Sequence, residues 1–119
     1  MYKVVMATRL KRKVFLSRNI RDDTLALSCD AVEGCSSRVL GYEFVPYGME
    51  LILDCKSEKE AKNIAQAIRY ATSRTIRKRY PELWSMPSFW TRNCLILEWS
   101  ESGQSRDAIH EFYDSLKTR

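Results

Sequence analysis

The feature that most constrains the fold is a long apolar stripe between Ser57 and Pro81. Its members recur every three or four residues, the spacing of one face of an α-helix: Ala61, Ile64, Ala65, Ile68, Thr72 and Ile76. Ser57 with Glu60 forms a capping-box start, and Pro81 prevents the helix from continuing. The segment is therefore predicted to be an amphipathic helix whose opposite side is polar and basic.

Strand-like segments surround this helix. Four have the composition or alternation of strands: residues 2–8, 39–45, 49–55 and 89–99. The second and third are joined by the turn signal Pro46-Tyr47-Gly48 and predict a hairpin. In its second strand Met49 and Glu50 are predicted to face opposite sides. Gly103 is expected to end the last strand.

Two further helices are predicted, over residues 20–36 and 107–117, the second with an apolar stripe of Ile109, Phe112, Tyr113 and Leu116. The order is therefore β-α-β-β-α-β-α. Its first six elements match the ferredoxin-like split β-α-β arrangement, an antiparallel sheet with two helices on one face, and the C-terminal helix is an addition. The chain is predicted to be one α+β domain over residues 1–119. This architecture carries many unrelated functions.

Composition fits a globular protein in a reducing compartment. Hydrophobic residues make up 45% of the 119, but no apolar run is long enough to cross a membrane, and the N-terminus lacks the apolar region of a secretory signal. Its cysteines form no C-x-x-C pair: Cys29, Cys35, Cys55 and Cys94. Free thiols and a cytoplasmic setting are therefore expected.

Positive charge is concentrated in two segments of a chain whose net charge is +5. The first is a run after the opening strand, and the second follows the polar side of the long helix. The candidate phosphate-contacting side chains are Arg9, Lys11, Arg12, Lys13, Lys62, Arg69, Arg74, Arg77 and Lys78. Clustered cations are typical of a polyanion-binding surface. The alternative is a solvated helix face that serves solubility.

Four stretches, spread over nearly the whole chain, resemble one family. They are Y-K-V-V-M-A-T-R-L-K-R-K-V-F, G-Y-E-F-V-P-Y-G-M-E-L-I-L, I-R-Y-A-T-S-R-T-I-R-K-R-Y-P-E-L-W and L-W-S-M-P-S-F-W. In order and spacing they are similar to the HUH-type single-strand tyrosine transposases (TnpA type) of the shortest bacterial insertion sequences, and to their relatives that act on repeated palindromes.

The resemblance implies a set of functional parts. In this family two histidines in an H-x-H pair on a strand hold one divalent metal, which acts as a Lewis acid on the scissile phosphate. A tyrosine on the last helix attacks that phosphate and forms a covalent 5′-phosphotyrosine. The resemblance also implies a homodimer whose basic helix and loops hold folded single-stranded DNA.

The chain departs from the family at these parts. Gly48 and Glu50 stand where the two histidines are expected, and the only histidine is His110. No two-histidine site is therefore possible within one protomer. Glu50 still offers a carboxylate, which suits Mg²⁺ or Mn²⁺. Asp54 lies on the same strand as Glu50, about 13 Å away along it. Glu43 lies on the other strand of the hairpin, nearer Glu50 or Asp54 depending on the hairpin register.

The nucleophile is displaced as well. In the family a glutamine one turn beyond the tyrosine usually completes the metal site. Counting along the family pattern places Phe112 at the tyrosine position and Leu116 at the glutamine position, with Tyr113 one residue late. One residue rotates a helix position by about 100°, which is expected to turn the Tyr113 hydroxyl away. Tyr113 is the remaining catalytic candidate, although it also lies on the apolar stripe, where core packing is expected.

The sequence is therefore interpreted as a transposase-like protein that binds single-stranded or hairpin DNA and has lost metal-dependent cleavage, with no cofactor expected. Trp84, Phe89 and Trp90 are candidates for stacking on bases, with core packing as the alternative. Two other functions stay open: an active transposase or nickase with a substituted Mg²⁺ or Mn²⁺ site, and a non-catalytic dimerisation module.

Overall fold

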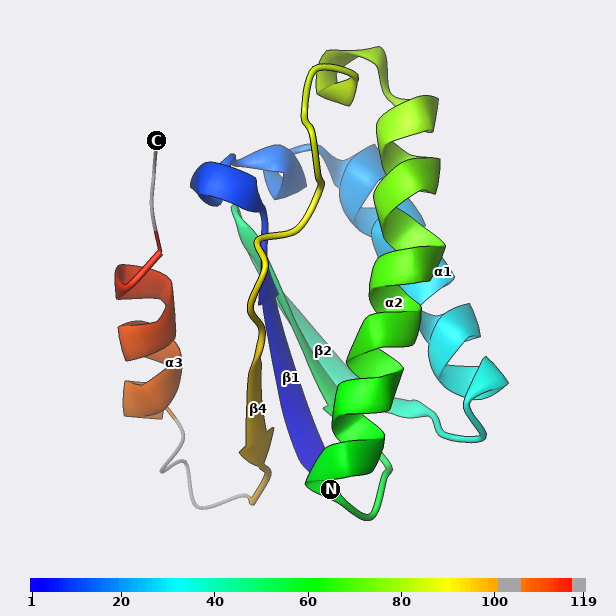
Figure 1. The fold of residues 1–119 in the computed structure, drawn as a ribbon, viewed down its shortest axis with the longest axis vertical. Coiled ribbons are helices and arrows are strands. Elements are labelled where there is room, and N and C mark those ends of the chain that lie inside the picture. The colour runs from blue at the N-terminus through cyan, green and yellow to red at the C-terminus, as the bar shows by residue number, and fades with distance from the viewer. Residues whose placement is uncertain (101–105, 117–119) are drawn as a thin grey trace.

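The computed structural model describes residues 1–100 and 106–116, and its elements follow the predicted order (Figure 1). The strands are β1 (Tyr2–Ala7), β2 (Val39–Val45), β3 (Gly48–Leu53) and β4 (Leu95–Glu98). The helices are α1 (Arg18–Gly34), α2 (Glu58–Arg79) and α3 (Arg106–Asp114), with short 3-10 turns at Arg9–Lys11, Val14–Leu16 and Pro81–Leu83. Gly103 and Lys117 lie outside the described residues. Within the described ranges, no helix has the length and apolarity needed to cross a membrane.

The strands form one antiparallel sheet in the order β2-β3-β1-β4. Helices α1 and α2 cover one face, as the split β-α-β pattern predicts, and α3 lies against the other (Figure 1). The predicted α+β fold class is therefore confirmed. Because the added C-terminal helix packs on the second face, both faces of the sheet are covered by helices.

Alternation along the strands supplies two separate cores. Met49, Leu51 and Leu53 of β3 are fully buried beneath α1 and α2. On the opposite face, Val5 and Ala7 of β1 pack against α3 in a second, smaller cluster. Glu50 belongs to this second face, as the sequence alternation predicts.

Helix α2 forms as the sequence predicts. The Ser57 side chain accepts a hydrogen bond from the backbone N–H of Glu60 at 3.1 Å, and the Glu60 carboxylate accepts one from the N–H of Lys56. The reciprocal half of the capping box is therefore displaced by one residue. The buried residues of α2 are the predicted stripe: Ala61, Ile64, Ala65, Ile68, Thr72 and Ile76. Its packing against the sheet fixes which side of the helix faces solvent.

The last strand is shorter than predicted, because only residues 95–98 of the predicted 89–99 pair continuously. Trp90 bridges to Thr8, and pairing with β1 resumes only where Leu95 meets Val5. Four residues of this segment therefore lie opposite two of β1, which breaks the ladder as a bulge does. Phe89 and Trp90 are instead buried, at 0% and 3% exposure, in the core beneath α2. Apart from the single bridge of Trp90, these two residues pack in the core and do not pair in a strand.

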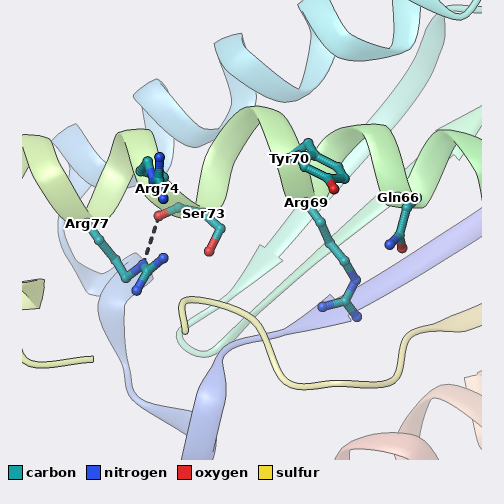
Figure 2. Close-up of a pocket in the computed structure, with 6 residues that line it drawn as sticks. All are labelled: Gln66, Arg69, Tyr70, Ser73, Arg74 and Arg77. Atoms are coloured by element: carbon teal, nitrogen blue, oxygen red, sulfur yellow. Dashed lines mark hydrogen bonds between the residues drawn. The ribbon is translucent and has the colours of Figure 1, made fainter. Parts of the chain in front are cut away.

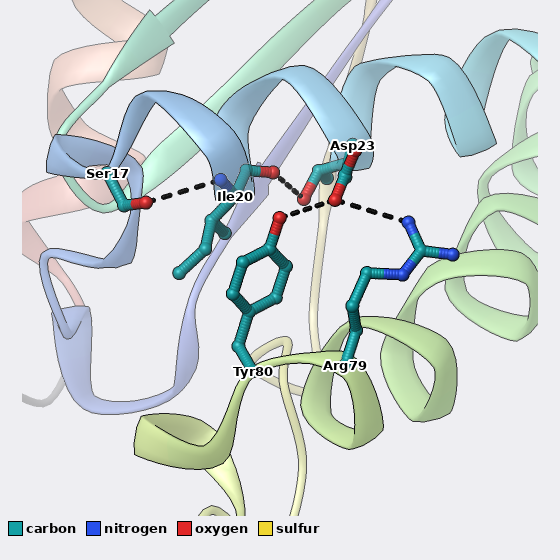
Figure 3. Close-up of polar contacts among 6 residues, drawn as sticks. Ser17, Ile20, Asp23, Arg79 and Tyr80 are labelled. Carbon is teal, nitrogen blue, oxygen red and sulfur yellow. Dashed lines mark hydrogen bonds and ion pairs between the residues drawn. The ribbon is translucent and has the colours of Figure 1, made fainter.

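A polar contact joins α1 to the end of α2 (Figure 3). The Tyr80 hydroxyl donates to the Asp23 carboxylate, and Arg79 forms an ion pair with the same carboxylate at 3.2 Å. The hydrogen bond from Tyr80, with help from Arg79, lowers the pKa of Asp23. Desolvation and the bond to Asp23 raise the pKa of Tyr80 to about 12.

This contact predicts a loss of stability in alkali. The folded state holds the Tyr80 proton more tightly than the unfolded chain, so the contribution of Tyr80 is complete below pH 10 and is lost as the pH rises toward about 12. The difference in free energy of unfolding between the wild type and Tyr80→Phe should shrink across that range. Urea unfolding of both proteins at neutral and alkaline pH measures it, and a constant difference would contradict the assignment.

Candidate functional site

The two positions that match the family's histidines lie on β3, which has a neighbouring strand on each side. Gly48 begins the strand and pairs with Ala7 of β1 and Val45 of β2. Glu50 points to the face that α3 covers, because its carboxylate meets Tyr113 of that helix. The strand therefore keeps the spacing of a two-ligand motif but carries one carboxylate and one glycine.

Glu50 is buried and held by two side chains. Only 2% of the residue is exposed. The Lys3 ammonium lies 3.1 Å from Glu50 Oε1, as an ion pair whose angles are not those of a hydrogen bond. The Tyr113 hydroxyl donates to Glu50 Oε2 at 3.2 Å. Because burying a carboxylate is costly unless it is paired and hydrogen-bonded, both contacts help to keep Glu50 inside.

Tyr113 lies at this position, and the prediction that its hydroxyl turns away is wrong. The apolar stripe of α3 sets the rotation of the helix. Ile109 and Tyr113 are buried, at 3% and 7% exposure, whereas Phe112 is only partly buried. Burial therefore selects Tyr113, and not Phe112, to face Gly48 and Glu50. The expectation that Tyr113 packs in the core is confirmed.

The electrostatic surroundings of Tyr113 oppose ionisation. Burial raises the pKa of its phenol far above the ordinary value, and the charge and hydrogen bond of Glu50 raise it further. A phenol in this state keeps its proton and donates a hydrogen bond to the Glu50 carboxylate. A nucleophile requires activation, by a lowered pKa or by an adjacent base with access to substrate. At 7% exposure, Tyr113 is better suited to holding α3 in place than to attacking a phosphate.

Gly48 allows the phenol to lie this close. A Cβ atom at position 48 would be 2.6 Å from Tyr113 Oη and 2.8 Å from Cε1, closer than van der Waals contact allows. The ring therefore fills the space that a ligand side chain at position 48 would need.

The residues present do not fit the divalent ion that the family implies. Gly48 has no ligand atom, and Glu50 is already paired with an ammonium group. Glu43 lies directly opposite Glu50 on β2, but Glu43 and Asp54 are in ion pairs with arginines at 3.6 and 3.4 Å. His110 is exposed. Over residues 1–100 and 106–116, no group of three or more His, Cys, Asp or Glu side chains is placed to hold a metal.

A second candidate site follows the exposed side of α2 (Figure 2). Two hollows there share Arg74 and Arg77. Together they form what we call the α2 groove, lined by Gln66, Arg69, Tyr70, Ser73, Arg74, Arg77, Lys78 and Trp84. None of these residues is acidic. Arg74 and Lys78 are exposed, and in the part of the chain that the structure describes their side chains have no ion-pair or hydrogen-bond partner. The groove therefore presents uncompensated positive charge.

Two arginines of the groove are engaged with backbone. Arg77 donates to the carbonyls of Ser73, Met86 and Pro87 at 3.0 to 3.1 Å. Arg69 donates to the carbonyl of Arg92 at 2.6 Å. Figure 2 shows both side chains directed toward the segment that runs beside the helix. Arg69 and Arg77 thus fasten residues 86–92 along α2, so they are less free to bind a ligand than Arg74 and Lys78.

The remaining candidate cations are spread around the groove. Arg9 donates to Ser88 at 3.3 Å, on the segment that Arg77 also holds. Lys11 places its ammonium 4.8 Å from the centroid of the Tyr47 ring. Arg12 and Lys13 are exposed and line a separate hollow near Pro81–Leu83. Lys62 lies beyond the other end of the groove, in an exposed ion pair with Glu58. The structure therefore brings Arg69, Arg74, Arg77 and Lys78 together, with Arg9 near the same segment.

Aromatic residues divide between core and surface. Phe89 and Trp90 are buried, and the Trp90 indole N–H donates to Thr72 at 2.8 Å, so neither is available to stack on bases. Trp84 is 67% exposed, with its N–H bonded to the carbonyl of Lys78. Tyr70 is 83% exposed and was missed in the sequence. Its position on the polar side of α2, two residues after Ile68, is the signal that would have found it.

Comparison with known proteins bears on this arrangement. The family described as "Transposase IS200 like" matches residues 1–112. A crystal structure of a candidate transposase from Deinococcus radiodurans R1 superposes with a TM-score of 0.86 at 18% identity, covering 99% of this chain and 91% of that one. At that identity it supports the fold alone. Among curated proteins, none matches. The family match spans nearly the whole chain, and on that ground the protein belongs to the IS200-like transposases.

Proposed function

We propose that this transposase-family protein binds DNA as structured single strands and does not cleave it by the family's metal-dependent route. The observation that carries the proposal is the contrast between the two sites. The α2 groove is open and positively charged, with Arg74 and Lys78 unpaired among the described residues. At the family's metal position, the Tyr113 ring fills the space beside Gly48 and the Lys3 ammonium neutralises the Glu50 carboxylate.

The charges of the groove suit a phosphate backbone. Cations without acidic neighbours can replace the counterions condensed on a nucleic acid, and releasing those ions drives binding. Arg69 and Arg77, although bonded to backbone carbonyls, keep their positive charge beside Arg74. The groove therefore supports polyanion binding better than an evenly solvated helix face would.

Exposed aromatic rings favour unpaired bases over duplex. Tyr70 and Trp84 lie in hollows of the groove that share Arg74, and they are 83% and 67% exposed. Large exposed rings beside cations are the combination used to bind single strands, since bases freed from pairing can stack on them. A duplex offers no free base face to such rings.

A binding experiment tests the groove. Arg74→Ala combined with Lys78→Ala should weaken binding of a labelled DNA hairpin with single-stranded flanks, and should reduce the slope of log affinity against log salt by about 1 to 2. Gel shifts across a salt series measure both quantities. Arg18→Ala combined with Arg38→Ala removes the same charge from exposed ion pairs away from the groove and should leave the slope nearly unchanged. Equal effects of the two pairs would contradict the proposed groove.

An adduct experiment tests the absence of cleavage. The same hairpin is incubated with the protein and Mn²⁺ or Mg²⁺, then separated under denaturing conditions. We expect no covalent protein–DNA product. An adduct that disappears in Tyr113→Phe would establish the alternative function, an active nickase. A homodimer and a cytoplasmic location complete the proposal, and both are supported by the family alone.

A further inference from the structure

The closed metal position contains its own cation. The Lys3 side chain is 11% exposed and its ammonium lies 3.1 Å from Glu50 Oε1. The same ammonium is 5.0 Å from the centroid of the Trp99 ring, a cation–π distance. A lysine is rarely buried to this degree unless it is paired. Lys3 therefore supplies, from within the chain, a positive charge next to Glu50.

Glu50 in turn anchors the C-terminal helix. Its second carboxylate oxygen accepts the Tyr113 hydrogen bond, and the Tyr113 ring closes over Gly48. Apolar side chains surround this contact, with Val5 and Ala7 of β1 on one side and Ile109 of α3 on the other. Polar contacts enclosed by apolar groups are strengthened by the low local dielectric. Breaking one of them leaves a buried group without a partner.

We propose that the position where related proteins hold a metal has become a docking site for this chain's own α3. In this site the Lys3 ammonium neutralises Glu50, Glu50 receives the Tyr113 hydroxyl, and Gly48 leaves room for the ring. The site lies on the sheet face opposite α1 and α2. It is therefore independent of the α2 groove, so a failure of DNA binding through the groove would leave it standing. It shares the closed metal position only with the proposed absence of cleavage, which the adduct experiment tests separately.

The test removes the internal cation and then the charge that it neutralises. Hydrogen exchange of the α3 amides reports docking, and the α2 amides serve as an internal control. Lys3→Met should speed exchange in α3 by at least about a hundredfold, because it leaves a buried carboxylate unpaired. Lys3→Met with Glu50→Gln should recover most of the protection, since a neutral amide oxygen still accepts the Tyr113 hydroxyl. Lys56→Met, at an exposed lysine, should change neither helix.

The outcomes separate cleanly. Loss of α3 protection alone, or loss of the whole fold in Lys3→Met, supports the proposal when the double variant restores what was lost. Unchanged α3 exchange in Lys3→Met, or a double variant no better than the single one, overturns it. Protection of wild-type α3 by added Mn²⁺ that disappears in Glu50→Gln would also overturn it, because Glu50 would then bind a metal in preference to Lys3.

Discussion

Ile68→Ala is expected to lower the free energy of unfolding by about 2 to 5 kcal/mol. Ile68 is 0% exposed and lies at the middle of the α2 stripe, in the cluster that packs α2 against β3. Removing most of its side chain loses buried apolar contact and leaves a cavity. The neighbouring helix and sheet are too constrained to fill that cavity completely. Urea unfolding followed by circular dichroism measures the change.

Tyr70→Ala is the matched control for this prediction. It lies two residues along the same helix, but its side chain is 83% exposed. Its effect on stability should stay within about 0.5 kcal/mol, whereas its effect on hairpin binding should be a loss. A stability loss below about 1 kcal/mol for Ile68→Ala, or a larger loss for Tyr70→Ala, would mean that the orientation of α2 is wrong.

The orientation of α2 was predictable from sequence because it depends on local signals. A cap at Ser57, a stop at Pro81 and an uninterrupted stripe all agree, and each acts over a few residues. The strand predicted over 89–99 is confirmed only at residues 95–98, for the opposite reason. β-Branched and aromatic residues are enriched in strands, but large aromatic residues are also buried in the core outside strands. The contacts from α2, where Arg69 donates to the carbonyl of Arg92 and Thr72 accepts the hydrogen bond of the Trp90 indole, show that the first part of this segment is fastened along the helix.

The candidate site was predictable in its parts but not in its assembly. The sequence locates Gly48, Glu50 and Tyr113. However, counting residues along α3 against the family pattern led to the prediction that the Tyr113 hydroxyl points away from the site. That prediction assumed that α3 has the same rotation about its axis as the last helix of related proteins. Here the rotation of α3 is set by the burial of Ile109 and Tyr113. Lys3 went unnoticed as a partner of Glu50 because their contact crosses from β1 to β3, and pairing register cannot be read from a single sequence.

Restoring a side chain at position 48 should destabilise the protein and should not revive a metal site. Gly48→Ala places a Cβ atom 2.6 Å from Tyr113 Oη, so the phenol must move and its bond to Glu50 must weaken. Overpacking of this kind costs about 1 to 3 kcal/mol, and Gly48→His, with a larger side chain, should cost more. Urea unfolding measures both variants, with the Tyr113 environment followed by near-ultraviolet circular dichroism.

The decisive comparison repeats Gly48→Ala in a Tyr113→Leu background. Leucine keeps apolar burial on α3 but lacks the ring atoms that meet position 48, so the alanine should then cost little. The two substitutions should be coupled by about 0.5 to 3 kcal/mol, the range for residues in direct contact. Additive effects would mean that the phenol does not occupy this space. The position would then be free for a ligand, and the reason for regarding the catalytic site as closed would be lost.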